Sequence, residues 1–424
     1  MKTILVFGAG KSATVLIDYL IDEASVNDWS IIIADVDREQ ILLKTRNSPH
    51  TEAIQADITN DAQRSKLVRE SSIVISMMPP SLHFLIAKDC VEYGKNLLTA
   101  SYLDAAIKGL QSAIEDKNLL FICEMGLDPG IDHMSAMKII DEIKSKSGVI
   151  TSFKSHCGGL VAPESDNNPW HYKISWNPRN VVLAGKAGAE YLLNNVIHRK
   201  KYQELFYNCA EVFINGLGKL AVYPNRDSLS YLPVYKLDDA TTFLRTTLRY
   251  PAFCLGWNAI VQADLANDVF IIDTERLSFS RWSSPILPFV NEGNQPLLHY
   301  LGLFEDAPIP DNLKTSADIL QYLLETRLKM LPADKDMIVM LHEIEYIQAG
   351  ITTKIESSLI VKGRDHLRTA MAKTVGLPLG IAAKLILNGT IQLTGLYIPT
   401  IKEIYVPVLA ELEKEGIYFS ERIL

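Results

Sequence analysis

The chain contains 424 residues, more than one compact hydrophobic core usually accommodates, so two or three domains are expected. It is 48% hydrophobic and 22% charged, a composition typical of soluble globular proteins that excludes a disordered or disulfide-stapled chain. The net charge of -8 argues against a general nucleic-acid-binding protein.

The cysteines are scattered and form no CxxC pair: Cys90, Cys123, Cys157, Cys209 and Cys254. This pattern favours reduced thiols in a cytoplasmic protein over a disulfide framework, and we expect no metal site. The N-terminal residues run directly into a strand-like segment, so no signal peptide is expected. The most apolar later stretch, 376–393, is interrupted by Lys384 and Asn388, so no membrane span is expected.

Strands and helices alternate in the N-terminal third of the chain. Apolar runs of strand length lie at 3–7, 31–34, 53–56, 73–77, 96–100 and 119–123. Helical spacing of apolar residues occurs between them, at 13–21, 82–93 and 104–117. Continuous apolar strands separated by amphipathic helices predict an α/β domain with a Rossmann-type doubly wound parallel sheet.

The turn after the first strand has the pattern G-x-G-x-x-A, formed by Gly8, Gly10 and Ala13 with Lys11 and Ser12 between the last two. Gly8 permits a tight turn, Gly10 lets a pyrophosphate approach the backbone, and Ala13 keeps the helix close to the sheet. The amide groups at the start of that helix suit phosphate binding. Because the pattern lies between a strand and a helix, it favours a dinucleotide site over a turn without a ligand.

Asp35 closes the second strand, where an acidic side chain typically bonds the ribose hydroxyls of the dinucleotide. A carboxylate there repels a 2′-phosphate, which favours NAD as the cofactor, with NADP also accepted. Asp37 competes for the same role, and Arg38 would soften the discrimination. An acidic residue that merely caps a turn is the alternative interpretation of Asp35.

Polar residues follow two later strands of the predicted sheet. Ser101 and Tyr102 follow the strand at 96–100, and Asp128 follows the strand at 119–123. The carboxyl ends of parallel strands face the ligand in this fold, so these side chains are expected to meet a substrate. Asp132 is expected to cap the next helix, and His133 to be a packed or surface histidine.

The middle of the chain carries further polar motifs. Two glycines after Cys157 indicate close approach of the backbone to a ligand or to another chain segment. His156 would lie on the opposite face of a strand from Cys157. Arg226 and Arg249 lie in or near loops, where they suit bidentate binding of carboxylates, although surface ion pairs are the commoner role.

Six blocks of sequence together resemble the glutamate-forming saccharopine dehydrogenase and saccharopine reductase family. The blocks are 99–102, 126–133, 157–160 with 162–164, 223–228, 335–340 and 371–378. The resemblance spans nearly the whole chain and is weakest at 256–334, where we expect a helical insertion. It implies a Rossmann domain followed by a mixed α/β domain for substrate binding and dimerisation.

The resemblance implies NAD(P)-dependent interconversion of saccharopine with L-glutamate and 2-aminoadipate 6-semialdehyde, in lysine metabolism. In the oxidative direction, hydride leaves the carbon joined to the bridging secondary amine, and water hydrolyses the resulting imine. This chemistry requires a dry pocket, an ordered water and groups that move protons. It also requires cationic or N–H partners for the carboxylates of the substrate.

The site residues carried over by the resemblance fall into three roles. Asp128 is expected to transfer a proton or orient the water, and Tyr102 and Cys157 to position and polarise the reacting amine. Leu127 and Asn177 match positions near the cofactor. The residues that match the substrate-binding strings are Ser101, Tyr102, Arg226, Thr247 and Arg249.

Two departures from the family pattern bear on these expectations. Members that use NADP usually carry an arginine after the second strand, whereas this chain has Asp35, so it resembles the NAD-dependent, degradative members. The Arg-Gly-Thr-Leu-Arg string of the family occurs here as 245–249, with Thr246 in place of the glycine, which alters the local backbone contact. Lys173 is interpreted as structural.

The expected organisation has three parts. Residues 1–127 form a NAD(P)-binding Rossmann domain, and residues 128–400 form the substrate domain with its helical insert at about 256–334. Residues 401–424 supply a helix that returns to the Rossmann domain. Because family members pair through the large sheet of the second domain, the resemblance also implies a homodimer.

Other functions stay open from the sequence. One is an NADP-dependent saccharopine reductase that works in the synthetic direction. Another is a carboxynorspermidine-type dehydrogenase, which the strings around Cys157 and Arg226 oppose. The third is a non-catalytic protein with a nucleotide-sensing Rossmann domain, which the presence of Asp128 and the arginines disfavours.

Overall fold

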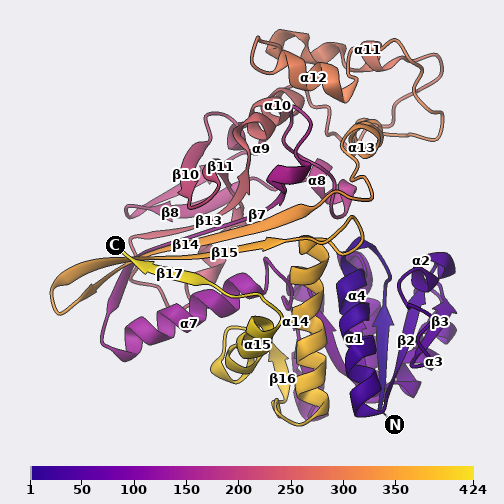
Figure 1. Ribbon diagram of the computed structural model, residues 1–424, viewed down its shortest axis with the longest axis vertical. Coiled ribbons are helices and arrows are strands. Elements are labelled where there is room, and N and C mark those ends of the chain that lie inside the picture. The colour runs from indigo at the N-terminus through magenta and orange to yellow at the C-terminus, as the bar shows by residue number, and fades with distance from the viewer. Residues whose placement is uncertain (1) are drawn as a thin grey trace. The chain divides into compact units, whose positions relative to one another are not determined.

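Residues 2–424 are described from a computed structural model of the chain (Figure 1). The chain forms two compact units. The first contains the residues up to Ser145 and Leu367–Phe419, and the second contains Lys146–His366 and Ser420–Leu424. The chain therefore leaves the first unit, returns to it, and ends in the second.

A seven-stranded sheet in the order β16-β6-β5-β4-β1-β2-β3 forms the centre of the first unit. Its strands are β1 (Lys2–Phe7), β2 (Trp29–Asp35), β3 (Thr51–Gln55), β4 (Ile73–Ser76), β5 (Asn96–Thr99), β6 (Leu120–Ile122) and β16 (Gly395–Tyr397). All of its pairings are parallel. The order of β1 to β6 is that of a Rossmann fold, which confirms the predicted fold class.

Helices surround this sheet. They are α1 (Thr14–Asn27), α2 (Arg38–Leu42), α3 (Asp61–Glu70), α4 (Pro80–Tyr93), α5 (Ala105–Lys108), α6 (Gln111–Asp116), α7 (Ile131–Ser145), α14 (Ala370–Leu387) and α15 (Lys402–Lys414), with the short η1 (Lys11–Ala13). The helix expected at 104–117 is divided into α5 and α6. The helix expected in the C-terminal segment is present as α15 and packs on α14 and α7.

Helix α14 packs against α1, although the two come from opposite ends of the chain (Figure 1). Gly376 and Gly380 make this approach close, because a Cβ on Gly376 would lie 2.9 Å from Cβ of Leu16. A Cβ on Gly380 would lie 2.7 Å from the ring of Tyr19. The two glycines are one helical turn apart, so they form a smooth face on α14.

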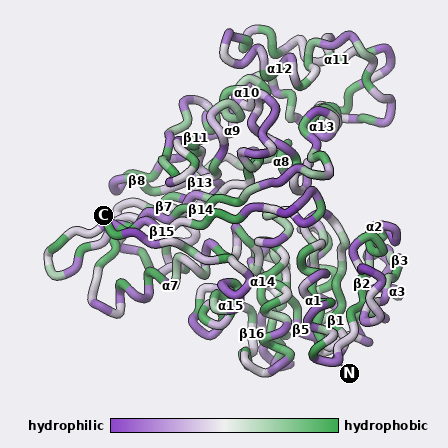
Figure 2. Tube along the Cα trace, in the orientation of Figure 1, coloured by the Kyte–Doolittle hydropathy of each residue, from purple (hydrophilic) through white to green (hydrophobic). Residues whose placement is uncertain are grey.

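Within residues 2–424, α14 is the one helix long and apolar enough to cross a membrane by length and composition, and 72% of it is buried inside the folded chain. Much of α14 is coloured as hydrophobic in Figure 2. Its burial against α1 is the packing expected of a core helix in a folded unit.

The second unit is built on a mixed ten-stranded sheet, whose main path is β10-β11-β13-β7-β14-β15-β17. Its strands are β7 (Val149–Val161), β8 (Ala189–Leu193), β9 (Val196–Lys200), β10 (Ala210–Ile214), β11 (Gly218–Pro224), β12 (Arg226–Asp227), β13 (Thr242–Arg249), β14 (Asp336–Gln348), β15 (Ile351–Lys362) and β17 (Ser420–Ile423). β13 runs parallel to β7, whereas β11 and β14 run antiparallel to their neighbours in this path.

Helical segments of the second unit lie mostly between β13 and β14. The α-helices are α8 (Pro178–Val182), α9 (Tyr202–Leu205), α10 (Pro251–Gln262), α11 (Phe279–Trp282), α12 (Gln295–Leu301) and α13 (Ser316–Arg327). The 3-10 turns are η2 (Pro163–Ser165), η3 (Leu229–Tyr231) and η4 (Ser284–Phe289). A separate apolar core, which includes the fully buried Trp170 and Trp257, holds these helices together.

The two units differ in their boundaries from the domains expected at 1–127 and 128–400. Helix α7 and the segment from Leu367 to Phe419 belong to the first unit. The physical reason is packing, because α14 lies on α1 and α15 lies on both α14 and α7. The helical segment after β13 belongs to the second unit.

Candidate functional site

The glycine turn is tight at its start and open in its middle. Gly8 has a φ of +99°, and its amide donates to the carbonyl oxygen of Ala34 at 2.8 Å. A Cβ on Gly8 would lie 3.0 Å from the carbonyl oxygen of Met77, whereas a Cβ on Gly10 would meet no atom within 4 Å. Ala13 is fully buried at the start of α1. The backbone at Gly10 is therefore accessible to a ligand, as a pyrophosphate requires.

Lys11 and Ser12 lie in η1, between Gly10 and α1. Lys11 is exposed and Ser12 is half-buried. Their position at the start of a helical segment that leads into α1 is the one at which main-chain amides face a bound phosphate in this fold.

The carboxylate of Asp35 lies against this turn. Its Oδ2 accepts a hydrogen bond from the amide of Ala9 at 2.6 Å, and its Oδ1 accepts one from the amide of Asp37 at 3.0 Å. The carboxylate of Asp37 instead caps α2, where it accepts from the amides of Glu39 and Gln40. Of the two candidate acids, Asp35 is the one that contacts the glycine turn.

Lys44, which was not predicted from the sequence, contacts the glycine turn through its side chain. Its ammonium group donates to the carbonyl oxygen of Gly10 at 2.5 Å and also to that of Ala9. Lys44 is only 4% exposed, and burial lowers its pKa to about 8, against the opposing attraction of Asp35. No motif marks this lysine, because its role arises from the path of the chain after α2.

A chain of hydrogen bonds joins the ends of β4 and β5 through His83 of α4. The hydroxyl of Ser76 lies 2.7 Å from Nδ1 of His83, and the hydroxyl of Ser101 lies 2.7 Å from Nε2. Burial lowers the pKa of His83 to about 4, with Asp104 opposing the shift, so the imidazole is neutral at physiological pH. Ser101 was predicted from the sequence, whereas His83 was expected only as part of a helix.

The segment between β6 and α7 presents Leu127 and Asp128. It is a compact turn, in which the amide of Asp132 donates to the carbonyl oxygen of Leu127 at 3.0 Å. Oδ1 of Asp132 accepts from the amide of Gly130 at 2.6 Å, next to the start of α7. The side chain of Leu127 is buried and that of Asp128 is half-buried.

Glu124 ties this turn to the segment that carries Ser101 and Tyr102. Its amide donates to the carbonyl oxygen of Ser101 at 3.0 Å, and its Oε1 accepts from the amide of Leu103, also at 3.0 Å. Its Oε2 lies 2.8 Å from Nε2 of His133, which is fully buried on α7. The predicted residues of the first unit thus lie on two chain segments held together by one buried carboxylate.

In the second unit, three neighbouring strands bring Cys157 and Thr247 together with Tyr223. Thr247 of β13 pairs in register with Cys157 of β7 on one side and with Tyr223 of β11 on the other. Cys157 and Tyr223 are buried, and burial raises the pKa of Tyr223 to about 12, so this residue remains a phenol. Strand β13 ends at Arg249, which is two residues beyond Thr247 and therefore lies on the same face of the strand.

Arg249 is a buried cation with incomplete hydrogen bonding. It is 4% exposed, its Nη1 donates to the carbonyl oxygen of Leu248 at 2.8 Å, and its guanidinium lies over the rings of Tyr172 and Phe253. Among residues 2–424, no acceptor reaches Nε, and no carboxylate lies within ion-pair distance. A buried guanidinium with a free donor is suited to a carboxylate supplied by a ligand.

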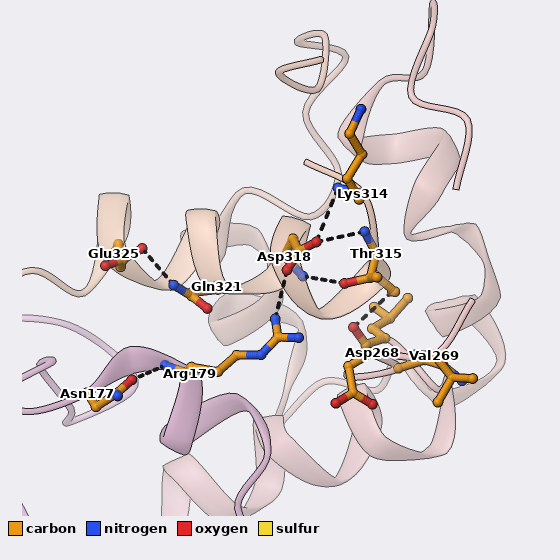
Figure 3. Close-up of polar contacts among 12 residues, drawn as sticks. Asn177, Arg179, Asp268, Val269, Lys314, Thr315, Asp318, Gln321 and Glu325 are labelled. Carbon is orange, nitrogen blue, oxygen red and sulfur yellow. Dashed lines mark hydrogen bonds and ion pairs between the residues drawn. The ribbon is translucent and has the colours of Figure 1, made fainter. Parts of the chain in front are cut away.

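Arg226 and Asn177 lie in more open parts of the second unit. Arg226 is exposed, has a φ of +50° and lies on β12, which pairs with β8. The side-chain oxygen of Asn177 caps α8 by accepting from the amide of Arg179 at 2.9 Å (Figure 3). Arg179 forms an ion pair with Asp318 of α13 at 2.8 Å, so Asn177 is held at a junction of two helices.

The remaining polar motifs of the second unit have structural roles. Nδ1 of His156 lies 2.7 Å from the hydroxyl of Thr246, and its Nε2 lies 2.9 Å from a carboxylate oxygen of Glu343. Lys173 forms a buried ion pair with Asp334 at 2.6 Å. Among residues 2–424, no group of three or more His, Cys, Asp or Glu side chains is arranged to hold a metal ion.

The first glycine after Cys157, Gly158, serves another chain segment. A Cβ on Gly158 would lie 2.4 Å from the carbonyl oxygen of Leu248 and 2.7 Å from its Cβ. Gly158 therefore lets β13 come close to β7, which decides between the two interpretations given above for this glycine.

These features define a dinucleotide-binding Rossmann protein with an added domain that carries a buried cation. Comparison with known proteins supports this class. The family model described as the saccharopine dehydrogenase NADP binding domain matches residues 4–122. The model described as the saccharopine dehydrogenase C-terminal domain matches residues 126–417. The chain belongs to the saccharopine dehydrogenase family, and the predicted resemblance is confirmed.

Individual relatives match along the whole chain. The saccharopine dehydrogenase [NADP(+), L-glutamate-forming] of Saccharomyces cerevisiae is 33% identical over 99% of this chain and 99% of its own length. The mitochondrial alpha-aminoadipic semialdehyde synthase of Bos taurus is 33% identical over 99% of this chain but only 47% of its own length. The chain thus spans about half the length of that relative.

A solved structure is also similar. The apo histidine-tagged saccharopine dehydrogenase (L-Glu forming) from Saccharomyces cerevisiae matches with a TM-score of 0.89 and 30% sequence identity, and the match covers 100% of both chains. The fold of this chain is therefore shared with a solved member of the family.

Proposed function

We propose that the chain oxidises saccharopine to L-glutamate and 2-aminoadipate 6-semialdehyde with NAD. The observation that carries this proposal is the buried guanidinium of Arg249, which needs an anionic partner and lies in the same patch as Cys157 and Thr247. A substrate with several carboxylates supplies such partners, and the family relatives named above are saccharopine dehydrogenases.

The residues of the second unit are proposed to bind the substrate. Arg249 and Thr247 hold one carboxylate, because a guanidinium and a hydroxyl both donate hydrogen bonds. Arg226, which is exposed, is proposed to hold a second carboxylate. Cys157 is proposed to line the position of the secondary amine.

The residues of the first unit are proposed to bind the dinucleotide and to move protons. When bound, the nicotinamide supplies the acceptor for the hydride that leaves the carbon next to the amine. Asp128 accepts a proton from the water that attacks the resulting imine, and the Tyr102 hydroxyl polarises the nitrogen. The open backbone at Gly10 fits the pyrophosphate, and Leu127 and Asn177 are proposed to lie near the cofactor.

We propose NAD as the preferred dinucleotide on the basis of Asp35. Its carboxylate bonds the amide of Ala9 in the glycine turn, which leaves further lone pairs for ribose hydroxyls. The same charge repels a 2′-phosphate. An NADP-dependent enzyme that works toward saccharopine is the second candidate, because the fungal relatives carry NADP(+) in their names.

The remaining expectations are retained as proposals. They are a cytoplasmic location and a homodimer formed through the sheet of the second unit. Residues 1–127 are proposed to bind the dinucleotide, and within 128–400 the substrate-binding role is proposed for the part that belongs to the second unit, Lys146–His366. Of the last segment, 401–424, only the part up to Phe419 lies in the first unit, because β17 pairs with β15 in the second unit.

The test is to mix the purified chain with saccharopine and either NAD or NADP, and to follow dinucleotide reduction with mass-spectrometric detection of L-glutamate. We expect reduction with saccharopine and a higher kcat/KM with NAD than with NADP. A protein that reduces NAD only with a different carboxyalkyl-amine would contradict the proposal. The matched control is the Asp128→Asn variant, which we expect to lose turnover and to keep its affinity for the dinucleotide.

A further inference from the structure

Three hydroxyl groups surround the imidazole of His83 at the carboxyl edge of the parallel sheet. The hydroxyl of Ser76 lies 2.7 Å from Nδ1, and the hydroxyl of Ser101 lies 2.7 Å from Nε2. The hydroxyl of Thr99 lies beside the ring at 3.3 Å from Nε2 and accepts from the amide of Ser101 at 3.2 Å. Ser76, His83 and Thr99 are at most 2% exposed, whereas Ser101 is half-buried.

This arrangement has a buried end and an accessible end. Ser76 is fully enclosed behind the ring, at the last position of β4. Ser101 lies just beyond the last position of β5, next to Tyr102. The imidazole is therefore the only group that connects the enclosed hydroxyl to the accessible one among the described hydrogen bonds of residues 2–424.

The ring can connect them in only two ways, because a neutral imidazole has one N–H donor and one acceptor nitrogen. In the first arrangement, Ser76 donates to Nδ1 and Nε2–H donates to Ser101, which leaves the Ser101 proton for a ligand acceptor. In the second arrangement, Nδ1–H donates to Ser76 and Ser101 donates to Nε2, which leaves only an acceptor for a ligand. Burial lowers the pKa of His83 to about 4, which keeps the ring out of the doubly protonated state.

We propose that His83 is a positioning residue that fixes the Ser101 hydroxyl as a hydrogen-bond donor toward a substrate carboxylate. The inference rests on the proposed function, because an anionic substrate group requires a donor at Ser101. It assigns the Nε2–H tautomer to His83 and makes Ser76 the donor that selects this tautomer. His83 itself makes no contact with the substrate in this account.

The chain offers a graded set of variants. His83→Leu removes both the donor and the acceptor, whereas His83→Gln keeps an amide N–H that reaches the position of Nε2. Ser76→Ala leaves the ring in place but removes the proton that holds Nδ1 as an acceptor. If His83 only filled space, the loss of activity in each variant would follow the loss of packing. His83→Gln would then be as impaired as His83→Leu.

The first experiment measures KM and kcat for saccharopine together with the dissociation constant of NADH. We expect His83→Leu to raise KM roughly tenfold with little change in kcat, as the loss of one hydrogen bond to a charged group implies. His83→Gln should recover most of this loss, Ser76→Ala should show part of it, and NADH affinity should stay constant. An unchanged KM in His83→Leu, or a Gln variant as impaired as Leu, overturns the inference.

The second experiment reads the tautomer directly and does not depend on turnover. Nitrogen-15 NMR of histidine-labelled wild-type protein identifies His83 by the signal that disappears in His83→Gln. The Nε2–H tautomer supports the inference, and the Nδ1–H tautomer or a doubly protonated ring at neutral pH overturns it. If the wild-type chain does not oxidise saccharopine, the proposed function fails while the NMR result still decides the tautomer.

Discussion

The charge of Lys44 should link dinucleotide affinity to pH, because its buried ammonium group supports the turn proposed to bind the pyrophosphate. Burial lowers the pKa of Lys44 to about 8, and Asp35 opposes this shift. A pyrophosphate bound at the turn adds negative charge nearby, which favours the protonated lysine and returns its pKa toward the unperturbed value of about 10.4. Binding and protonation of Lys44 are therefore coupled.

The size of the effect follows from the two pKa values. If binding returns the pKa of Lys44 fully to its unperturbed value, the affinity for the dinucleotide falls by up to about thirtyfold between about pH 7 and about pH 9.5. The reason is that Lys44 loses its proton in the free protein and keeps it in the complex. In the ligand-free protein, the unfolded chain binds more protons than the folded chain between about pH 8 and about pH 10.4. The free energy of unfolding therefore rises with pH in that window, by up to about 3 kcal/mol from this lysine.

Fluorescence titration with NADH across this pH range measures the affinity, and chemical denaturation measures the stability. The Lys44→Met variant supplies the matched control, because it removes the titrating group and keeps an apolar stem of similar length. Relative to the variant, the wild-type protein should lose NADH affinity and gain free energy of unfolding as the pH rises. Parallel pH profiles for the two proteins would refute the proposed role of Lys44.

Three further predictions follow from single positions. Arg249→Met should raise KM for saccharopine by roughly a hundredfold and leave NADH affinity unchanged, because a buried carboxylate contact is worth about 3 kcal/mol. Steady-state kinetics measure this change, with Arg249→Lys as the control. Asp35→Ser should raise kcat/KM with NADP relative to NAD, measured with both dinucleotides; a variant that gains no NADP use would show that Asp35 does not contact the ribose. Gly158→Ala should lower the free energy of unfolding by about 3 kcal/mol, because its Cβ would lie 2.4 Å from the carbonyl oxygen of Leu248. Gly10→Ala is the control for that variant, since its Cβ meets no atom within 4 Å; it should weaken NADH binding with little change in the denaturation midpoint.

The Rossmann sheet could be predicted because its strands are short continuous apolar runs separated by helical spacing. Each of the first six strands lies at such a run, and the glycine turn follows β1 as the motif requires. β16 could not be found in this way, because three residues carry no periodicity and its pairing with β6 comes from the far end of the chain. The same distance in sequence explains why α14 was not assigned to the first unit.

The candidate site was predictable where a residue belongs to a motif and not where packing creates its role. Asp35 ends β2 and Ser101 follows β5, so sequence position alone indicates both residues. Lys44 and His83 lie on or just after ordinary helices, and only the folded chain brings one to the glycine turn and the other to the ends of β4 and β5. The glycine pair after Cys157 was ambiguous in sequence, because close approach of a ligand and of a strand require the same residue type.

The central claim concerns where the hydride originates. Saccharopine with both hydrogens replaced by deuterium on the lysine-derived carbon bonded to the bridging nitrogen should pass one deuterium to NAD, and mass spectrometry of the reduced dinucleotide detects it. We expect labelled NADH together with unlabelled L-glutamate. Unlabelled NADH formed from this substrate would place the oxidation at another carbon and contradict the account.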